Sequence, residues 1–274
     1  MAEIALHHRR AGEGEPLVAV HGIGSTWQVW NPVLPALEER HDVLALSLPG
    51  YGESPPVAGE PTVPALVDAV EEAMGAAGFD TAHIVGNSMG GWIAAELAAR
   101  GRARTVVATS PAGMWTAKEL KYSRGVLRSS YAAAQRLAPY AERITATAAG
   151  RRMAFGMTYA RPERLDPADA AYAIKVFAGS PSFLRTLDWI EEGREMPRGL
   201  HSIYCPFRVV WGSRDLLLPV RQAPRWAAHI KGAEVVRLPG LGHVPMGDDP
   251  VTTAAKILEV TAPAGAREPQ AAAG

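Results

Sequence analysis

Cysteine is almost absent from this 274-residue sequence, in which Cys205 is the single thiol. One cysteine excludes an internal disulfide, and the lack of a Cys/His cluster around it excludes a zinc site of the finger kind. The role we expect for Cys205 is that of a buried structural thiol. Net charge is absent as well, since 28 basic and 28 acidic side chains balance. A neutral chain is not expected to have nucleic acid or an anionic membrane surface as its main partner.

Long hydrophobic runs are also missing. Residues 1–10 contain no continuous apolar stretch of the kind found in a secretion signal, and no later segment approaches the roughly 20 apolar residues that span a bilayer. We therefore expect a cytoplasmic protein. Hydrophobic residues nevertheless make up 47% of the chain, enough for the core of one large α/β domain, alone or with an insertion.

Strand and helix patterns alternate along much of the chain. Short apolar segments predict strands at residues 4–9, 16–20, 42–48, 83–85, 105–109, 207–211 and 233–238. Apolar residues at intervals of three and four predict helices at residues 26–40, 63–75, 89–100, 219–230 and 250–260. This alternation predicts an α/β fold with a mostly parallel central sheet and helices on both of its faces.

The alternation stops between residues 112 and 204. Helical patterns separated by proline and glycine fill this stretch, at residues 118–138, 167–177 and 183–192. Helices inserted between two strands of one sheet predict a helical cap over the strand ends. The expected units are therefore a core of residues 1–111 and 205–262, a cap of residues 112–204, and a disordered Ala/Gly/Pro-rich tail at residues 263–274.

The most informative motif is a serine between two glycines, Gly86-Asn87-Ser88-Met89-Gly90, between an expected strand and an expected helix. A serine on such a sharp turn has a strained backbone, and side chains two positions to either side must be nearly absent. Gly86 and Gly90 satisfy that requirement. This nucleophile elbow lifts the Ser88 hydroxyl above the sheet edge and points the helix N-terminus at any oxyanion that forms there.

A serine hydroxyl attacks a carbonyl at neutral pH only when a base takes its proton and a carboxylate orients that base. Asp215 directly follows an expected strand and so lies at the carboxyl end of the sheet, where we place the acid. His243 follows the last expected strand on a glycine-containing loop, and we assign it as the base. The chain order Ser88, Asp215, His243 is the order that a nucleophile elbow on an α/β sheet demands.

Other histidines and carboxylates are weaker candidates. Asp248 and Asp249 are near His243 in sequence, but we expect both to cap the closing helix. His21 ends a central strand, where a packed histidine that braces the next loop is expected rather than a mobile base. His83 is expected to be buried and hydrogen-bonded inside the elbow strand.

The tetrahedral oxyanion of acyl transfer needs hydrogen-bond donors, each worth about 3 kcal/mol. Two backbone amides are candidates for this role. One belongs to Met89, directly after the nucleophile, and the other to Ile23, in the glycine-rich loop His21-Gly22-Ile23-Gly24.

Together these motifs resemble the α/β-hydrolase fold superfamily in its capped, serine-nucleophile, esterase-like form. Five segments carry the resemblance in the family's order, namely residues 21–22, 48–54, 86–91, 211–215 and 242–245. The resemblance spans most of the chain, although the cap has no recognisable motif. It implies a catalytic triad, an oxyanion hole and a cap over the site.

The reaction we expect is acyl transfer to water, with no metal or organic cofactor. A serine at the elbow excludes the family's halide- and epoxide-opening branches, which carry an aspartate there. The expected substrate is a small molecule, a small to medium neutral carboxylic ester or lactone. Its pocket is expected to include Gly24, Met114, Trp115, Phe183, Trp189 and Val244.

Alternative functions remain open. The elbow also resembles that of meta-cleavage product hydrolases, which hydrolyse a carbon–carbon bond of a vinylogous diketone. Those enzymes tend to have tryptophan after the catalytic histidine, where this chain has Val244, and their carboxylate-binding arginine has no assigned counterpart, Arg185 being one candidate. A cofactor-free lyase, an acyl transferase or a ligand sensor on the same fold are further alternatives. The sequence gives no basis for an oligomeric state.

Overall fold

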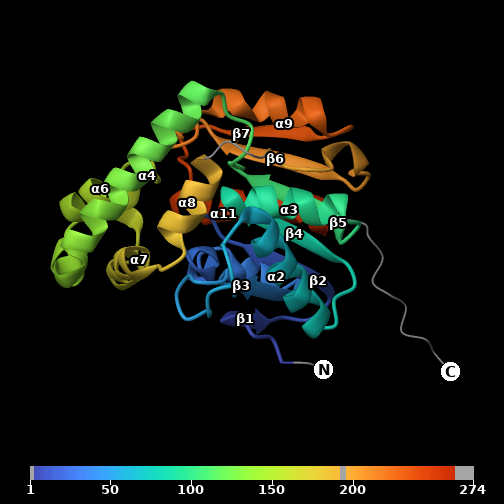
Figure 1. The fold of residues 1–274 in the computed structure, drawn as a ribbon, viewed down its shortest axis with the longest axis horizontal. Coiled ribbons are helices and arrows are strands. Elements are labelled where there is room, and N and C mark those ends of the chain that lie inside the picture. Colours follow the sequence, from blue (N-terminus) through green and yellow to red (C-terminus); the bar gives the residue numbers. More distant parts are fainter. Residues whose placement is uncertain (1–2, 192–195, 263–274) are drawn as a thin grey trace.

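The computed structural model describes residues 3–191 and 196–262, and a seven-stranded sheet lies at the centre of this part of the chain (Figure 1). The strands are β1 (His8–Ala11), β2 (Glu15–Val20), β3 (His41–Leu46), β4 (Ala82–Asn87), β5 (Ala103–Thr109), β6 (Phe207–Gly212) and β7 (Glu234–Leu238). Their spatial order is β1-β3-β2-β4-β5-β6-β7, and only β1 is antiparallel to its neighbour. The expected mostly parallel sheet is confirmed. The expected tail at residues 263–274 lies outside the described residues.

Helices cover both faces of the sheet, because its central strands are apolar on both sides. Val18 and Ile84 belong to one hydrophobic core, whereas the adjacent Leu17 and Val85 belong to the other. The first core contains α2 (Val63–Ala76), α3 (Met89–Ala99) and α9 (Ala223–His229). The second contains α1 (Leu34–Glu38), α10 (Pro245–Asp248) and α11 (Pro250–Thr261).

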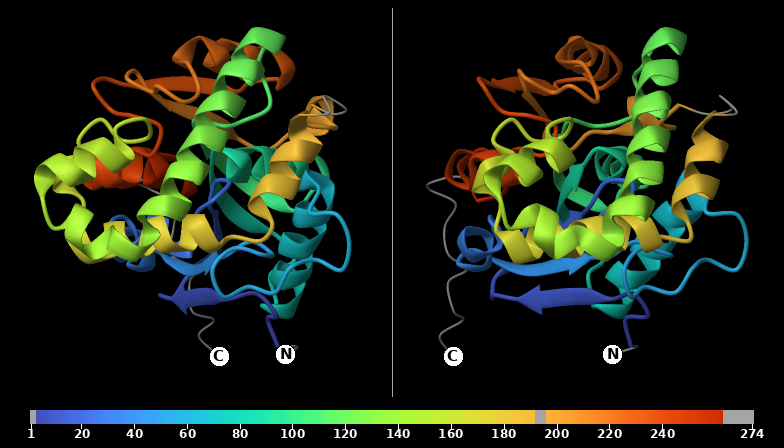
Figure 2. Two further views of the ribbon diagram at one scale, coloured as in Figure 1. Left: turned by 60° about the vertical axis from the view of Figure 1, so that its left-hand side comes forward. Right: turned by 90° about the vertical axis from the view of Figure 1, so that its left-hand side faces the viewer.

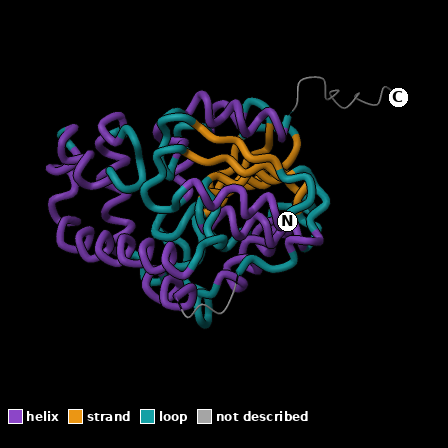
Figure 3. Tube along the Cα trace, turned by 90° about the horizontal axis from the view of Figure 1, so that it is seen from above, coloured by secondary structure: helices purple, strands orange, loops and turns teal. Residues whose placement is uncertain are grey.

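Among the residues that the structure describes, five further α-helices are inserted between β5 and β6. These inserted helices are α4 (Ala117–Leu137), α5 (Ala141–Thr145), α6 (Ala148–Phe155), α7 (Pro167–Gly179) and α8 (Phe183–Glu191). Figures 2 and 3 show that most of them form a separate layer beside one end of the sheet. Side chains of α4 and α8 lie around a cavity that also borders Ser88, at the carboxyl end of β4. The inserted helices therefore border the end of the sheet where the site residues were expected.

Some element boundaries differ from those predicted. The helix expected at residues 26–40 is a short 3-10 helix (Trp27–Trp30) followed by α1, because Pro32 and Pro35 interrupt the pattern. The first strand begins at His8 rather than residue 4, and α5 and α6 were not predicted. None of the helices within residues 3–191 and 196–262 has the length and apolar character needed to cross a membrane.

Candidate active site

Ser88 lies on a strained turn between β4 and α3. Its φ of 55° and ψ of −118° fall outside the regions that a serine ordinarily adopts. Space around the turn is minimal, since a Cβ on Gly86 would lie 2.1 Å from the Gly90 carbonyl oxygen. A Cβ on Gly90 would lie equally close to the carbonyl oxygen of Val20 on β2. The two glycines of the motif thus allow the tight packing that fixes the position of Ser88.

His243 and Asp215 form a buried hydrogen bond of 2.8 Å between Nδ1 and Oδ2, and their side chains are 4% and 0% exposed. Asp215 also accepts hydrogen bonds from the Leu217 and Leu218 amides and from the Trp211 indole. Both oxygens of this carboxylate therefore accept hydrogen bonds. Because it accepts from Nδ1, the Nε2 atom of a neutral His243 carries a lone pair that can act as a base.

The histidine loop lies beside the elbow. The Asn87 side-chain amide donates to the His243 carbonyl oxygen at 3.0 Å, and also to the carbonyl and hydroxyl oxygens of Thr109 on β5. Asn87, directly before the serine, thereby ties the loop to two strands. Ser88, Asp215 and His243 are all buried at the carboxyl edge of the sheet.

The glycine-rich loop after β2 packs directly against the elbow. A Cβ on Gly22 would lie 2.9 Å from the Cβ of Ser88, so only glycine permits this approach. His21 braces the loop as expected, since its Nδ1 lies 2.7 Å from the Gly22 carbonyl oxygen and its Nε2 accepts from the Leu48 amide. Burial lowers the pKa of His21 to about 4 despite the Gly22 contact, so the ring is neutral at pH 7.

A small cavity of about 30 Å³ borders Ser88 and has a mostly apolar lining. Its lining includes Ile23, Met89, Ala112, Trp115, Leu120, Arg124, Leu127, Leu187, Ile190, Leu217 and Leu218. The amides of Ile23 and Met89 donate to no acceptor within the described part of the chain. Residues of α4 and α8 were missed at the sequence level, although the spacing of Leu120, Arg124 and Leu127 places them on one helix face.

Several predicted pocket residues occupy other positions. Met114 and Phe183 are buried in the first hydrophobic core, and Trp189 packs near Trp92 with a ring separation of 6.3 Å. Val244 is buried in the second core. Of the six residues expected in the pocket, Trp115 lines the Ser88 cavity and Gly24 lines a larger cavity described below.

Asp248 does not cap the closing helix. Its side chain is buried and accepts hydrogen bonds from the amides of Gly242, Ala160 and Arg161 at 2.7 to 3.0 Å. Asp249 is the cap of α11 and accepts from the Thr252 amide. Asp248 instead joins the histidine loop to the segment that follows α6.

Two further predictions concern an arginine and a metal. Arg185 donates to the Gly59 carbonyl on the surface and does not line the Ser88 cavity, whereas Arg124 does and pairs with Glu191 at 2.6 Å. Within residues 3–191 and 196–262, no group of three His, Cys, Asp or Glu side chains has a metal-binding arrangement.

Comparison with known proteins gives the family. The sequence model described as the alpha/beta hydrolase family matches residues 17–256. The epoxide hydrolase EphH of Mycobacterium tuberculosis is 32% identical over 196 residues, which cover 68% of this chain and 88% of that protein. The dihydrolipoyllysine-residue acetyltransferase component of the acetoin cleaving system of Cupriavidus necator is 30% identical over 241 residues, covering 86% of this chain. The chain spans 60% of the length of that relative.

A solved structure has the same fold. The enol-lactonase of Burkholderia xenovorans LB400 superposes with a TM-score of 0.74 and 22% identity, over 93% of this chain and 95% of that one. At this identity the likeness concerns the fold alone. Since the family model covers most of the sequence, this protein belongs to the alpha/beta hydrolase family.

Proposed function

We propose that the protein is a serine hydrolase that cleaves a small to medium neutral carboxylic ester or lactone through an acyl-enzyme on Ser88. The observation that carries the proposal is the strained elbow serine at the same sheet edge as the buried His243–Asp215 hydrogen bond. Acyl transfer requires an imidazole Nε2 that can take the proton of a serine on a helix N-terminus.

In the proposed reaction, His243 Nε2 takes the proton of Ser88 Oγ while Oγ attacks the carbonyl carbon of the substrate. The amides of Ile23 and Met89 stabilise the resulting oxyanion. The imidazolium, stabilised by Asp215, returns its proton to the alkoxide as the bond to the alcohol breaks. Water then attacks the acyl-enzyme by the same steps and releases the acid. All of these roles are filled by groups of the chain itself.

The proposed substrate class follows from the lining of the Ser88 cavity. Ten aliphatic, aromatic or thioether side chains suit an uncharged acyl group, and Arg124 is already paired with Glu191. We further propose that residues 112–204 act as a cap, because α4 and α8 cover this cavity and exclude water from the acyl-enzyme.

The test is hydrolysis of p-nitrophenyl esters from acetate to dodecanoate by the native protein and by Ser88→Ala. We expect Ser88→Ala and His243→Gln each to reduce kcat/KM by at least about a thousandfold. Ser110→Ala is the matched control, because Ser110 is a buried serine that also has a positive φ but is not the proposed nucleophile. Circular dichroism establishes folding, and near-native turnover by folded Ser88→Ala contradicts the proposal.

Carbon–carbon hydrolysis is a second candidate, since Arg124 could bind a substrate carboxylate at the cavity if it were released from Glu191. Loss of colour of a ring-fission dienone, with no ester turnover, would favour this reaction. Because the chain is similar to the epoxide hydrolase EphH, an epoxide should be tested as a substrate as well. Opening of styrene oxide that does not depend on Ser88 would contradict the acyl-enzyme mechanism.

A further inference from the structure

A second cavity, of about 390 Å³, lies at the seam between the inserted helices and the core, and we refer to it as the seam cavity. It is bordered by the loop at residues 24–32, by the segment from Phe155 to Val176, and by residues 247–250 after the histidine loop. The Ser88 cavity holds little more than one water molecule, whereas the seam cavity has the volume of a small-molecule site. A substrate of ordinary size therefore needs more room than the Ser88 cavity offers.

The two cavities meet at one loop. Ile23 lines the Ser88 cavity and the next residue, Gly24, lines the seam cavity. Above Gly24 lies an aromatic partition, which consists of Tyr131, Phe177 and Phe183 with ring centroids 4.7 to 5.5 Å apart. A Cβ on Gly24 would approach the Phe177 ring to 2.6 Å, so the partition rests directly on this glycine.

Neighbours of these rings line one cavity or the other, although the rings themselves are not among the lining residues. Leu127 and Leu187, each four residues from a partition ring on the same helix, line the Ser88 cavity. Val176, adjacent to Phe177, lines the seam cavity. A substrate that occupies both cavities would therefore require Phe177 to move.

The seam cavity lies on the side of the histidine. It borders Gly247 and Asp248, and Asp248 accepts from the Gly242 amide next to His243. No residue between 239 and 250 lines the Ser88 cavity. In the proposed reaction His243 protonates the leaving oxygen, so the alcohol half of an ester extends toward the histidine side.

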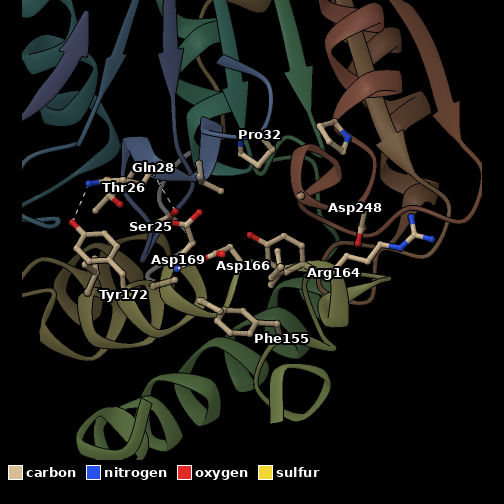
Figure 4. Close-up of a pocket in the computed structure, with 18 of the residues that line it drawn as sticks. Ser25, Thr26, Gln28, Pro32, Phe155, Arg164, Asp166, Asp169, Tyr172 and Asp248 are labelled. Atoms are coloured by element: carbon tan, nitrogen blue, oxygen red, sulfur yellow. Dashed lines mark hydrogen bonds between the residues drawn. The ribbon is translucent and has the colours of Figure 1, made fainter. Parts of the chain in front are cut away.

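Two acceptors at the seam cavity have no hydrogen-bond partner within the described residues, whereas Asp166 and Asp248, which also line it, accept from backbone amides. The carboxylate of Asp169 has no hydrogen bond or ion pair within the described residues. The residue is exposed, and partial desolvation together with Asp166 raises its pKa. The amide oxygen of Gln28 is buried without a partner, while its amide nitrogen donates to the Tyr172 hydroxyl. Figure 4 shows Asp166 and Asp169 facing the hollow, with the Arg164 guanidinium extending away from them. Such a lining suits a neutral ligand that is rich in hydroxyl donors.

Aromatic rings supply the remaining walls. Phe155, Tyr159 and Tyr172 line the seam cavity together with aliphatic side chains. Flat apolar faces alongside carboxylate acceptors match a ring whose carbon–hydrogen face is apolar and whose edge carries hydroxyl groups.

We propose that the seam cavity binds the alcohol half of the substrate, that this alcohol is polyhydroxylated, and that the acyl half is a short aliphatic group at Ser88. The proposal rests on the esterase function above. It makes Asp169 a determinant of alcohol specificity and Phe177 the side chain that moves when the ester binds.

The first test compares two acetate esters of equal ring size, 6-O-acetylglucose and cyclohexylmethyl acetate. We expect kcat/KM to favour the sugar ester by roughly tenfold, because its hydroxyl groups satisfy the free acceptors. Asp169→Asn should raise KM for the sugar ester roughly fivefold relative to KM for methyl acetate. Glu163→Gln is the control, since Glu163 is on the same inserted segment but does not line the cavity. Equal kcat/KM for the two ring esters overturns the proposal.

The second test removes the Phe177 ring from the partition. Phe177→Ala should increase kcat/KM for 6-O-acetylglucose relative to methyl acetate, whereas Phe155→Ala, on the cavity wall, should decrease it. Phe177→Leu repeats the test if the alanine variant does not fold. A common effect of both alanine substitutions on both esters would contradict a partition.

A binding measurement tests the seam cavity independently of the hydrolytic reaction. Calorimetric titration of Ser88→Ala with 6-O-acetylglucose reports the seam cavity without catalysis, and Asp169→Asn in that background should weaken binding roughly fivefold. Asp169-dependent binding supports the seam site even if the native protein hydrolyses no ester. Ser88-dependent hydrolysis of p-nitrophenyl acetate without any sugar binding supports the esterase and overturns the seam site.

Discussion

Asp248→Asn removes one oxygen from a carboxylate on which three backbone amides depend. Oδ2 accepts from Gly242 and Ala160, and Oδ1 accepts from Arg161. An asparagine has a single acceptor oxygen, so in either orientation its NH₂ group faces at least one N–H donor. The side chain is buried, and water does not readily replace the lost acceptor.

The expected loss is about 3 kcal/mol of unfolding free energy, from one unsatisfied buried amide and weaker hydrogen bonds to the others. For a chain of this size it corresponds to a fall in Tm of about 6 to 12 °C. Urea denaturation followed by circular dichroism measures it, with an unchanged m-value as evidence that the unfolded state is unaffected.

The neighbouring aspartate provides a matched control. Asp249 caps α11, and asparagine is as good an N-cap as aspartate, so Asp249→Asn should cost less than about 0.5 kcal/mol. The two adjacent positions thus receive the same substitution with different expected results. If Asp248→Asn is as stable as Asp249→Asn, the three hydrogen bonds do not have the energetic role assigned to them.

Three further perturbations test other parts of the structure. Gly86→Ala should abolish folding or lower the unfolding free energy by more than about 4 kcal/mol, because the new Cβ would lie 2.1 Å from the Gly90 carbonyl oxygen. Gly75→Ala in α2 is the control. Open space surrounds Gly75, so this substitution should raise the unfolding free energy by up to about 1 kcal/mol in the same urea assay. Burial lowers the pKa of His21 to about 4, so His21 stays neutral in the folded state while the unfolded chain binds a proton below pH 6.5. Between pH 8 and pH 5 this residue alone should lower the unfolding free energy by about 2 kcal/mol, and His21→Gln should reduce the pH dependence by that amount, with the part due to His41 remaining. Glu119→Gln should lower the unfolding free energy by about 2 kcal/mol in urea denaturation. Burial opposes ionisation of the Glu119 carboxylate, but its hydrogen bonds to two arginines and to the Thr116 amide outweigh burial and lower its pKa to about 2. A variant as stable as the native protein would contradict this role.

The sequence predicts the sheet and the elbow well because their signals are local. Gly86 and Gly90 are required by contacts within a few residues or with the adjacent strand, so the motif itself carries the geometry. The same holds for Asp249, whose partner is three residues away.

The role of Asp248 could not be predicted, because two of its three partners are backbone amides 87 and 88 residues away, and an amide has no identity in the sequence. The seam cavity presents the same difficulty, since three distant segments form its walls. For Phe183 and Trp189 the helix was predicted, but the direction of each side chain depends on how α8 packs against its neighbours.

The contacts of the inserted helices indicate which of them are fixed. At one end, Glu119 on α4 pairs with Arg221 and Arg225 near α9. At the other, the Thr158 carbonyl accepts from the Val244 amide in the histidine loop, and Asp248 holds the segment that follows. These anchors restrain α4 and the end of α6, so movement that admits a substrate is expected in the aromatic rings between them.

That arrangement has a consequence for catalysis. Hydrogen bonds join the histidine loop to the inserted segment after α6, so a rigid displacement of the inserted helices would strain the loop that positions His243 against Asp215. The rotation of Phe177 that we propose would break none of those hydrogen bonds, because the ring takes part in none of them. Side-chain movement would therefore preserve the orientation of the proposed base, whereas rigid displacement of the inserted helices would disturb it.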